Sequence, residues 1–168
     1  MTQHEKAISA VTWGFMMALT VSQVILSLFL YNRPHLSVIR NAGWIILWIA
    51  GLFGVIPTFT FRKKGGVAKG RDYSHTTVLV DSGIYGVVRH PQYLSFMLIN
   101  LGLLLIAQQW LTTAVGVVAM VLNYQIMVEA DQAGIEKFGK DYLRYMEKVP
   151  RMNFLAGVIR LARRRQSE

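Results

Sequence analysis

Long stretches of apolar residues with few charges dominate the pattern along this chain. They cover approximately residues 8–31, 38–61, 93–107 and 111–128. An α-helix rises about 1.5 Å per residue, so runs of roughly 17 to 25 apolar residues can cross the hydrocarbon core of a bilayer. The pattern therefore predicts four transmembrane helices, of which the third and fourth are short and cross steeply.

Only residues 108–110 separate the third and fourth spans, which predicts a tight helical hairpin with Trp110 at the membrane interface. Polar side chains inside these spans, namely Asn100, Asn123 and Gln125, are expected to form hydrogen bonds between helices. The first apolar stretch is too long for the core of a secretory signal, so we expect it to be a retained span.

The pattern changes after the fourth span. Residues from Phe154 to Arg165 mix apolar side chains with arginines, a composition typical of an interfacial helix on anionic lipid. Before them, apolar and aromatic residues recur at steps of three and four. This predicts an amphipathic helix that continues from the fourth span and packs its aromatic side chains. These residues are Ile135, Phe138, Tyr142, Tyr145 and Val149.

The composition agrees with this pattern. The 168 residues have a mean hydropathy of +0.35 and only 16% are charged, which favours one domain in lipid over a soluble protein. The net charge of +9 lies in clusters that are not interleaved with aromatics, so we interpret it as membrane-surface charge and expect no nucleic-acid partner. The chain has no cysteine and its four histidines are not at ligand spacing, so no metal is expected.

Lysine and arginine are distributed unequally between the two sides of the predicted spans. Of the 18, all but Arg33 and Arg40 fall on the side that holds Lys6, the segment 62–89 and the tail from Lys137. By the positive-inside rule, both termini and this segment face the cytoplasm. A prokaryotic plasma membrane is the expected location.

The loop between the second and third spans carries turn and strand signals. Gly65, Gly66 and Gly70 predict flexibility, and residues 76–80 form a β-prone run that ends at a turn at residues 81–83.

Two groups of charged residues are the candidates for chemistry. Arg89 and His90 stand immediately before the third span, and Pro91 suits its first position, where the missing N–H costs nothing. Glu129 and Asp131 stand at the end of the fourth span, where an acid must be paired or hydrated. In a hairpin these groups face each other. They form either interfacial anchors and a structural ion pair, or a site for a polar cofactor.

The order and spacing of these residues resemble a known family. The chain shows Gly-Ile-Tyr at 83–85, Arg-His-Pro-x-Tyr at 89–93, Phe-Gly-x-x-Tyr-x-x-Tyr at 138–145 and Val-Pro-Arg at 149–151. This pattern is similar to that of the isoprenylcysteine carboxyl methyltransferase family and, more loosely, to that of the phospholipid N-methyltransferases. The resemblance covers residues 78–151, and the first two spans carry no motif.

The resemblance implies a methyltransferase that uses S-adenosylmethionine in a cytoplasm-facing pocket. Catalytic roles fall to Arg89, Glu129 and Asp131. Family members have two adjacent acids seven and eight residues before Phe-Gly, where this chain has Asp131 and Ala130, with Glu129 one step earlier, so either acid can serve. The residues implied to bind the cofactor are Leu79, Val80, Gly83, Tyr85, His90, Pro91, Tyr93 and Glu129.

The nature of the acceptor decides which residues act. Methyl transfer from a sulfonium is an in-line displacement that depends on positioning and on the local electrostatic field more than on acid–base steps. A carboxylate acceptor needs a cation, for which Arg89, Arg144 and Arg151 are the candidates. An amine acceptor instead needs Glu129 or Asp131 to take its proton.

We therefore predict an all-α polytopic membrane protein with about four transmembrane helices and a cytoplasmic C-terminal amphipathic helix. Residues 1–168 form a single membrane domain, with two spans at 1–61, a cofactor-binding methyltransferase core at 62–151 and a basic interfacial tail at 152–168. The expected methyl acceptor is lipid-like or prenylated, and the tail is expected to contact anionic membrane lipids. The alternatives are a phospholipid amine N-methyltransferase and a non-enzymatic membrane scaffold.

Overall fold

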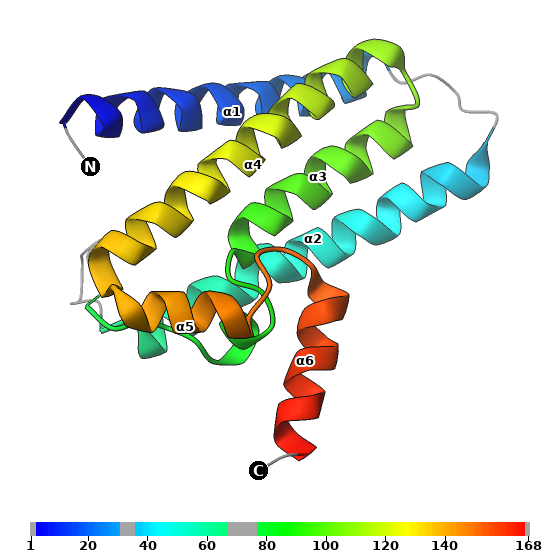
Figure 1. Cartoon of the computed structure of the whole chain (residues 1–168). Coiled ribbons are helices and arrows are strands. Elements are labelled where there is room, and N and C mark those ends of the chain that lie inside the picture. The colour runs from blue at the N-terminus through cyan, green and yellow to red at the C-terminus, as the bar shows by residue number, and fades with distance from the viewer. Residues whose placement is uncertain (1–2, 31–35, 67–76, 167–168) are drawn as a thin grey trace. The chain divides into compact units, whose positions relative to one another are not determined.

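The structure is a computed structural model that describes residues 3–30, 36–66 and 77–166, without the side chains of residues 3–9 and 164–165. Within these residues every regular element is helical, which confirms the all-α prediction (Figure 1). The elements are α1 (Gln3–Phe29), α2 (Ser37–Lys64), the 3₁₀ helix η2 (Gly83–Gly86), α3 (Pro91–Ala107), α4 (Trp110–Phe138), α5 (Lys140–Lys148) and α6 (Phe154–Gln166).

Three of the described helices are long and apolar enough to cross a membrane: α1 over Ala10–Phe29, α2 and α4. Much of their apolar surface is exposed, as lipid-facing helices require, since hydrocarbon is the surrounding solvent. The chain is therefore an integral membrane protein. The third predicted span corresponds to α3, an apolar helix of 17 residues, and its crossing of the membrane stays a prediction.

The sequence signals at the ends of α3 and α4 are confirmed in part. Pro91 is the first residue of α3, as its missing N–H predicted. The hairpin connection is one residue shorter than expected, because α4 already begins at Trp110. The Gln109 side chain caps this helix, since its Oε1 accepts the backbone N–H groups of Leu111 and Thr112 at 2.7 and 3.0 Å.

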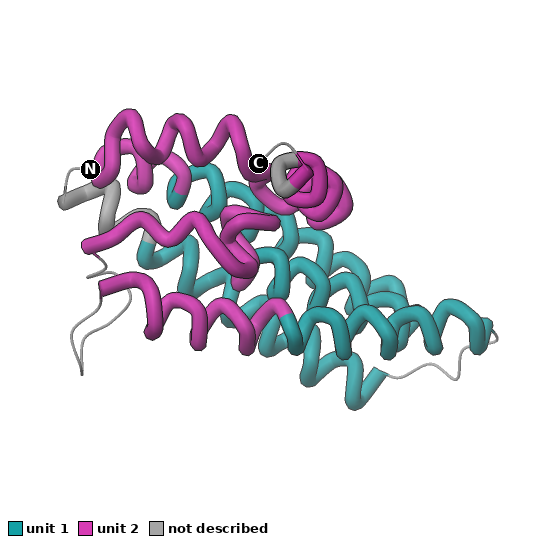
Figure 2. Tube along the Cα trace, turned by 90° about the horizontal axis from the view of Figure 1, so that it is seen from below, with its two compact units in different colours: residues 1–52, 93–130 teal, residues 53–92, 131–168 magenta. Residues whose placement is uncertain are grey.

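The chain forms two compact units, which Figure 2 shows in different colours. Unit 1 comprises residues 1–52 and 93–130, and unit 2 comprises residues 53–92 and 131–168. The boundaries fall inside α2 and inside α4, so neither unit is a continuous stretch of sequence.

In unit 1, α2 packs closely on α3 through small residues. A Cβ on Gly43 would lie 2.8 Å from the Gly102 carbonyl oxygen, and a Cβ on Gly102 would lie 3.0 Å from that of Gly43. The Ser95 hydroxyl donates a hydrogen bond of 2.8 Å to the Ala50 carbonyl. Small residues of this kind allow close helix approach in a membrane, where no hydrophobic force drives helices together.

Helix α1 is joined to α3 and α4 by the fully buried side chain of Gln23. Its Nε2 donates to the carbonyls of Asn100 and Thr112, both at 3.1 Å, and the Asn100 amide donates to Thr20 at 3.3 Å. A Cβ on Gly116 would collide with the Gln23 amide, so the glycine makes the space for it. Buried amide contacts thus fix the position of α1 within unit 1.

The sequence prediction for polar residues in the spans is correct for two of three positions. Asn100 bonds to Thr20 of α1, and Asn123 Nδ2 donates to the Tyr93 carbonyl of α3 at 2.7 Å. The prediction that Gln125 bridges two helices is wrong, because its side chain is exposed and borders a surface groove.

We expect Gln23→Leu to lower the free energy of unfolding by about 1–2 kcal/mol, because interhelical hydrogen bonds in membranes contribute roughly 0.6 and at most about 1.7 kcal/mol each. Thermal unfolding in detergent, followed by circular dichroism, measures the change. The matched control is Gln125→Leu, which removes the same groups at an exposed position. Equal melting temperatures for the two variants would contradict a bridging role for Gln23.

The predicted continuation of the fourth span as one amphipathic helix is wrong. Helix α4 ends at Phe138, and α5 begins at Lys140 after Gly139, whose φ of +56° is a left-handed conformation that glycine adopts without strain. The turn brings α5 back against α4, where the Tyr142 ring leaves no room for a Cβ on Gly134.

The aromatic residues after this turn form a small core, which confirms that they pack together. Tyr142, Tyr145 and Val149 are buried, with Leu79, Ile135, Phe138 and Met146 packed against them. The β-prone run before α3 is not a strand over the described residues 77–80, while Thr76 and Gly70 lie outside the described residues.

Candidate active site

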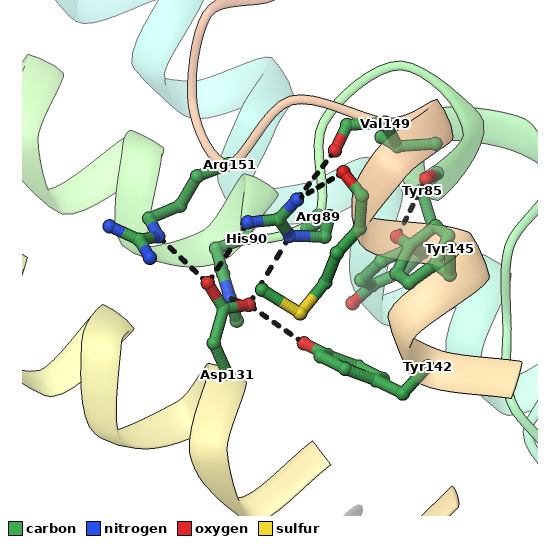
Figure 3. A network of polar contacts seen from close by, with 9 residues as sticks. Tyr85, Arg89, His90, Asp131, Tyr142, Tyr145, Val149 and Arg151 are labelled. Atoms are coloured by element: carbon green, nitrogen blue, oxygen red, sulfur yellow. Dashed lines mark hydrogen bonds and ion pairs between the residues drawn. The ribbon is translucent and has the colours of Figure 1, made fainter. Parts of the chain in front are cut away.

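The Asp131 carboxylate is the centre of a buried polar network in unit 2, shown in Figure 3. Its Oδ1 accepts hydrogen bonds from Arg89 Nε at 3.2 Å and Tyr142 OH at 2.9 Å, and His90 Nε2 lies 2.7 Å away. Its Oδ2 accepts from Arg89 Nη2 at 3.0 Å and Arg151 Nε at 2.7 Å. With 2% of its surface exposed, Asp131 therefore has its acceptor capacity filled by the protein itself.

Arg89 joins this carboxylate to the end of α5. Its Nη1 donates to the carbonyls of Met146 and Val149 at 2.9 and 2.7 Å, which are among the carbonyls that a helix C-terminus leaves without partners. Together with the two hydrogen bonds to Asp131, these contacts use four of the five N–H groups of the Arg89 guanidinium. Contacts among the described residues thus use all but one of the N–H groups of the Arg89 guanidinium, which favours a positioning role.

The backbone reinforces the same junction. The N–H of Arg89 donates to the Pro150 carbonyl at 3.1 Å, and the N–H of His90 donates to the Arg151 carbonyl at 3.3 Å. The segment before α3 and the segment after α5 therefore run together for two residues, and both side chains and main chain determine where His90 lies.

The turn before this segment is held by aromatic contacts. Gly83 has a φ of +65°, a left-handed conformation, and it begins the 3₁₀ helix η2. The Tyr145 hydroxyl donates to the Tyr85 carbonyl at 2.7 Å, and the Tyr85 ring contacts Phe61 with centroids 5.2 Å apart. Of the residues implied to bind the cofactor, Leu79, Val80, Gly83, Tyr85, His90 and Pro91 lie in unit 2, whereas Tyr93 and Glu129 lie in unit 1.

The electrostatics of the network favour anions. Two guanidinium groups face one carboxylate, so their charges sum to +1 when His90 is neutral. Burial raises the pKa of Tyr142 above its ordinary value, and the nearby Asp131 carboxylate raises this pKa further. Burial also raises the pKa of Tyr145. Both hydroxyls therefore stay protonated at neutral pH and act as hydrogen-bond donors.

Glu129, the other candidate acid, has a different environment in unit 1. Its Oε2 is buried and has no hydrogen-bond partner among the described residues. A buried carboxylate oxygen without a donor is costly and requires an explanation. Asp131 and Glu129 thus differ sharply: protein donors fill the acceptor capacity of Asp131, whereas Glu129 has a buried oxygen without a donor among the described residues.

A groove in unit 1 offers an apolar surface. It has a volume of about 600 Å³ and lies on α3 and α4. Gln125, at its border, stands one helical turn before Glu129 on α4. The lining residues are Met97, Val117, Met120, Val121, Tyr124 and Gln125.

The sequence profile of the phospholipid methyltransferase family matches residues 39–133, more than half of the chain. The chain belongs to this family. A curated relative, the protein-S-isoprenylcysteine O-methyltransferase of Schizosaccharomyces pombe, is 28% identical over 98 residues, which covers 53% of this chain and 42% of the relative. The alignment thus spans less than half of that relative. Both findings agree with the resemblance inferred from the motifs.

The match to the phospholipid methyltransferase family includes Arg89, His90, Glu129 and Asp131 but ends before α5. The network therefore combines residues inside the matched region with Tyr142 and the segment that follows α5. Among the described residues, no three His, Cys, Asp or Glu side chains group closely enough to hold a metal ion.

Two features of this network were not predicted from the sequence. Tyr142 was predicted only as a packing residue, although a tyrosine in an apolar stripe close to a buried acid is a signal for a hydroxyl donor. The carbonyls of Met146 and Val149 have no sequence signal. Arg144, a candidate cation, does not join the network, since it is 71% exposed and pairs with Asp141 at 3.4 Å.

Proposed function

We propose that the protein is an integral membrane methyltransferase that transfers a methyl group from S-adenosylmethionine to a lipid-like acceptor. The observation that carries the proposal is the Asp131 network, which fixes the Arg89–His90 segment inside the region that matches the phospholipid methyltransferase family. Membership of a methyltransferase family and three apolar helices support the same function.

S-adenosylmethionine fits the residues available. The molecule carries a sulfonium, an ammonium, a carboxylate and hydroxyl groups, and when bound it supplies an activated methyl group. The buried, unpartnered Oε2 of Glu129 suits an ammonium or hydroxyl donor of this cofactor. In this proposal Leu79, Val80, Gly83, Tyr85, His90, Pro91 and Tyr93 line the cofactor, and the protein contributes orientation and a charged environment.

The proposed acceptor is a prenylated or otherwise lipid-like carboxylate. The name of the Schizosaccharomyces pombe relative indicates O-methylation of an isoprenylcysteine, and the groove on α3 and α4 has the apolar lining that a hydrocarbon chain needs. An acceptor carboxylate needs a cation to orient it. The network has a net positive charge, and within it Arg151 is 26% exposed at its side chain while Arg89 is buried. Arg151 is therefore the proposed orienting cation.

A second candidate is N-methylation of a phospholipid amine, which the family description favours. This reaction needs an acceptor for the amine proton, and the unpartnered carboxylate oxygen of Glu129 suits that role. The two candidates therefore assign different importance to Arg151 and Glu129.

The proposal includes a membrane arrangement in which α3 is a fourth span and α5 and α6 lie on the cytoplasmic side with both termini. The distribution of lysine and arginine supports this orientation, and a prokaryotic plasma membrane is the proposed location. Residues 1–168 act as a single membrane domain. The proposed partners are the methyl acceptor and the surrounding lipids, with no nucleic acid and no metal.

Calorimetric titration of the detergent-purified protein with S-adenosylhomocysteine tests the proposal, and we expect micromolar binding. Transfer of a labelled methyl group to a prenylated cysteine or to phosphatidylethanolamine then separates the two candidates. A carboxyl methyl ester releases its label in alkali, whereas an N-methyl group keeps it. If the folded protein binds no S-adenosylhomocysteine, the scaffold alternative replaces the enzyme.

A further inference from the structure

Helix α6 has one face that packs within unit 2. The Phe154 ring contacts Phe53 edge to face, with centroids 5.3 Å apart. The backbone of Gly157 lies directly against the Val87 carbonyl, and any side chain at this position would collide with it. Since residues 154, 157 and 161 lie at helical spacings of three and four, the same face carries the partly buried Leu161. This face of α6 supports the segment that leads to Arg89 and His90.

A second face of the same helix is apolar and exposed. Leu155, Val158 and Ile159 are 72%, 42% and 52% exposed, and their spacing of three and four places them in one stripe with the exposed Ala162. A contiguous apolar stripe of this kind on water-exposed surface marks an interaction site. The helix has 13 residues, which is too short to span a bilayer.

The charge of α6 indicates what covers this stripe. The helix contains four arginines and no acidic residue. Arg163 follows Ile159 by one helical turn and borders the apolar stripe, where its long side chain can extend into a headgroup layer. Arg160 lies further round the helix, is exposed, and donates a hydrogen bond of 3.4 Å to the Glu147 carbonyl. Apolar residues beside a uniformly basic flank are typical of a helix that lies in the interface of an anionic bilayer.

We propose that the partner of α6 is the anionic surface of the bilayer itself. Leu155, Val158 and Ile159 insert at the boundary between headgroups and acyl chains, and Arg160 and Arg163 bind acidic lipid headgroups. Because Gly157 contacts Val87, the lipid surface then holds the segment Val87–His90 at the depth of the headgroups. The proposal concerns lipid binding and does not rest on methyl transfer.

The test uses the absence of cysteine from the chain, which allows a single Ile159→Cys variant to carry an environment-sensitive fluorophore. The labelled full-length protein is reconstituted in nanodiscs of phosphatidylcholine alone or with about 30% phosphatidylglycerol, an anionic content that creates a negative surface potential. Quenching by neutral acrylamide reports exposure to water. We expect blue-shifted emission and at least about fivefold weaker quenching in anionic discs, since each arginine near such a surface favours binding about fivefold.

Two comparisons make the result specific. Adding Arg160→Gln and Arg163→Gln is expected to remove the preference for anionic discs, and about 1 M salt is expected to weaken it in the unsubstituted helix, because the screening length falls to about 3 Å. A label at Lys140→Cys, an exposed position at the start of α5, controls for general effects of the discs. Equal quenching in both kinds of disc overturns the proposal. Protection that depends on the number of protein copies per disc also overturns it, because a second copy would then cover the stripe.

Discussion

Asp131→Asn is expected to lower the free energy of unfolding by about 3–5 kcal/mol, because it leaves buried arginine without the carboxylate that compensates its charge. Arg89 and His90 are buried against Asp131, and the amide of asparagine cannot accept at both of its ends as a carboxylate does. Thermal and denaturant unfolding in detergent, followed by circular dichroism, measure the loss. We also expect S-adenosylhomocysteine binding to fall, since the Arg89–His90 segment loses its anchor.

The matched control for this prediction is Asp141→Asn. Asp141 also pairs with an arginine, but both side chains are more than 70% exposed, and exposed ion pairs contribute about 0–1 kcal/mol. A second variant, Arg89→Met combined with Asp131→Leu, removes the buried carboxylate together with the buried arginine that pairs with it, and is expected to recover part of the stability. A change below about 1 kcal/mol for Asp131→Asn would contradict the central role of this carboxylate.

Glu129→Gln is expected to weaken S-adenosylhomocysteine binding by about 10- to 100-fold, the range for loss of a hydrogen bond to a charged group. The same change is expected to leave the protein as stable as before or more stable, because it replaces a buried carboxylate whose Oε2 lacks a partner. Opposite effects on binding and stability distinguish a ligand-binding acid from a structural one. Calorimetric titration and thermal unfolding of the same preparation provide both measurements.

Glu136→Gln serves as the control, since Glu136 is an exposed acid seven residues later on the same helix. Unchanged affinity in Glu129→Gln would remove this residue from the proposed cofactor site. A large loss of stability would instead indicate that Glu129 pairs within the protein.

The sequence predicted the apolar helices well, because a chain in lipid must satisfy its backbone within helices and therefore uses long apolar runs. Pro91 also marked the start of α3 correctly, since proline is tolerated at the first helical position. The break at Gly139 was missed. The apolar spacing from Phe138 to Tyr142 is four residues, which fits a continuous helix equally well, so only the left-handed backbone at Gly139 reveals the turn.

The choice between the two acids could not be made from the sequence. Glu129 and Asp131 are two positions apart, so their side chains leave α4 about 200° apart. Tertiary packing decides which of the two side chains meets Arg89 and His90, and the pattern of a single sequence does not show that packing. The sequence did predict that an acid of this pair faces those two residues, and the structure assigns that contact to Asp131.

The hydrogen-bond partners of Arg89 could not be predicted, for a similar reason. The residue stands beside a motif that suggested contact with substrate, yet most of its donors are used by groups that lie far along the chain. The Val149 carbonyl is 60 residues away in sequence, and no local pattern connects the two. A positioning role therefore became visible only from the folded geometry.

The network around Asp131 has a consequence for biosynthesis. Its members come from the segment before α3, the end of α4 and the segment that closes with Arg151. During synthesis the N-terminal parts of a chain emerge first, so α1 to α4 have all emerged before Arg151 leaves the ribosome. A nascent chain that ends at Phe138 contains Arg89 and Asp131. It lacks Tyr142, Arg151 and the carbonyls that accept hydrogen bonds from Arg89. The polar network therefore becomes complete only after the four helices that precede it have been synthesised.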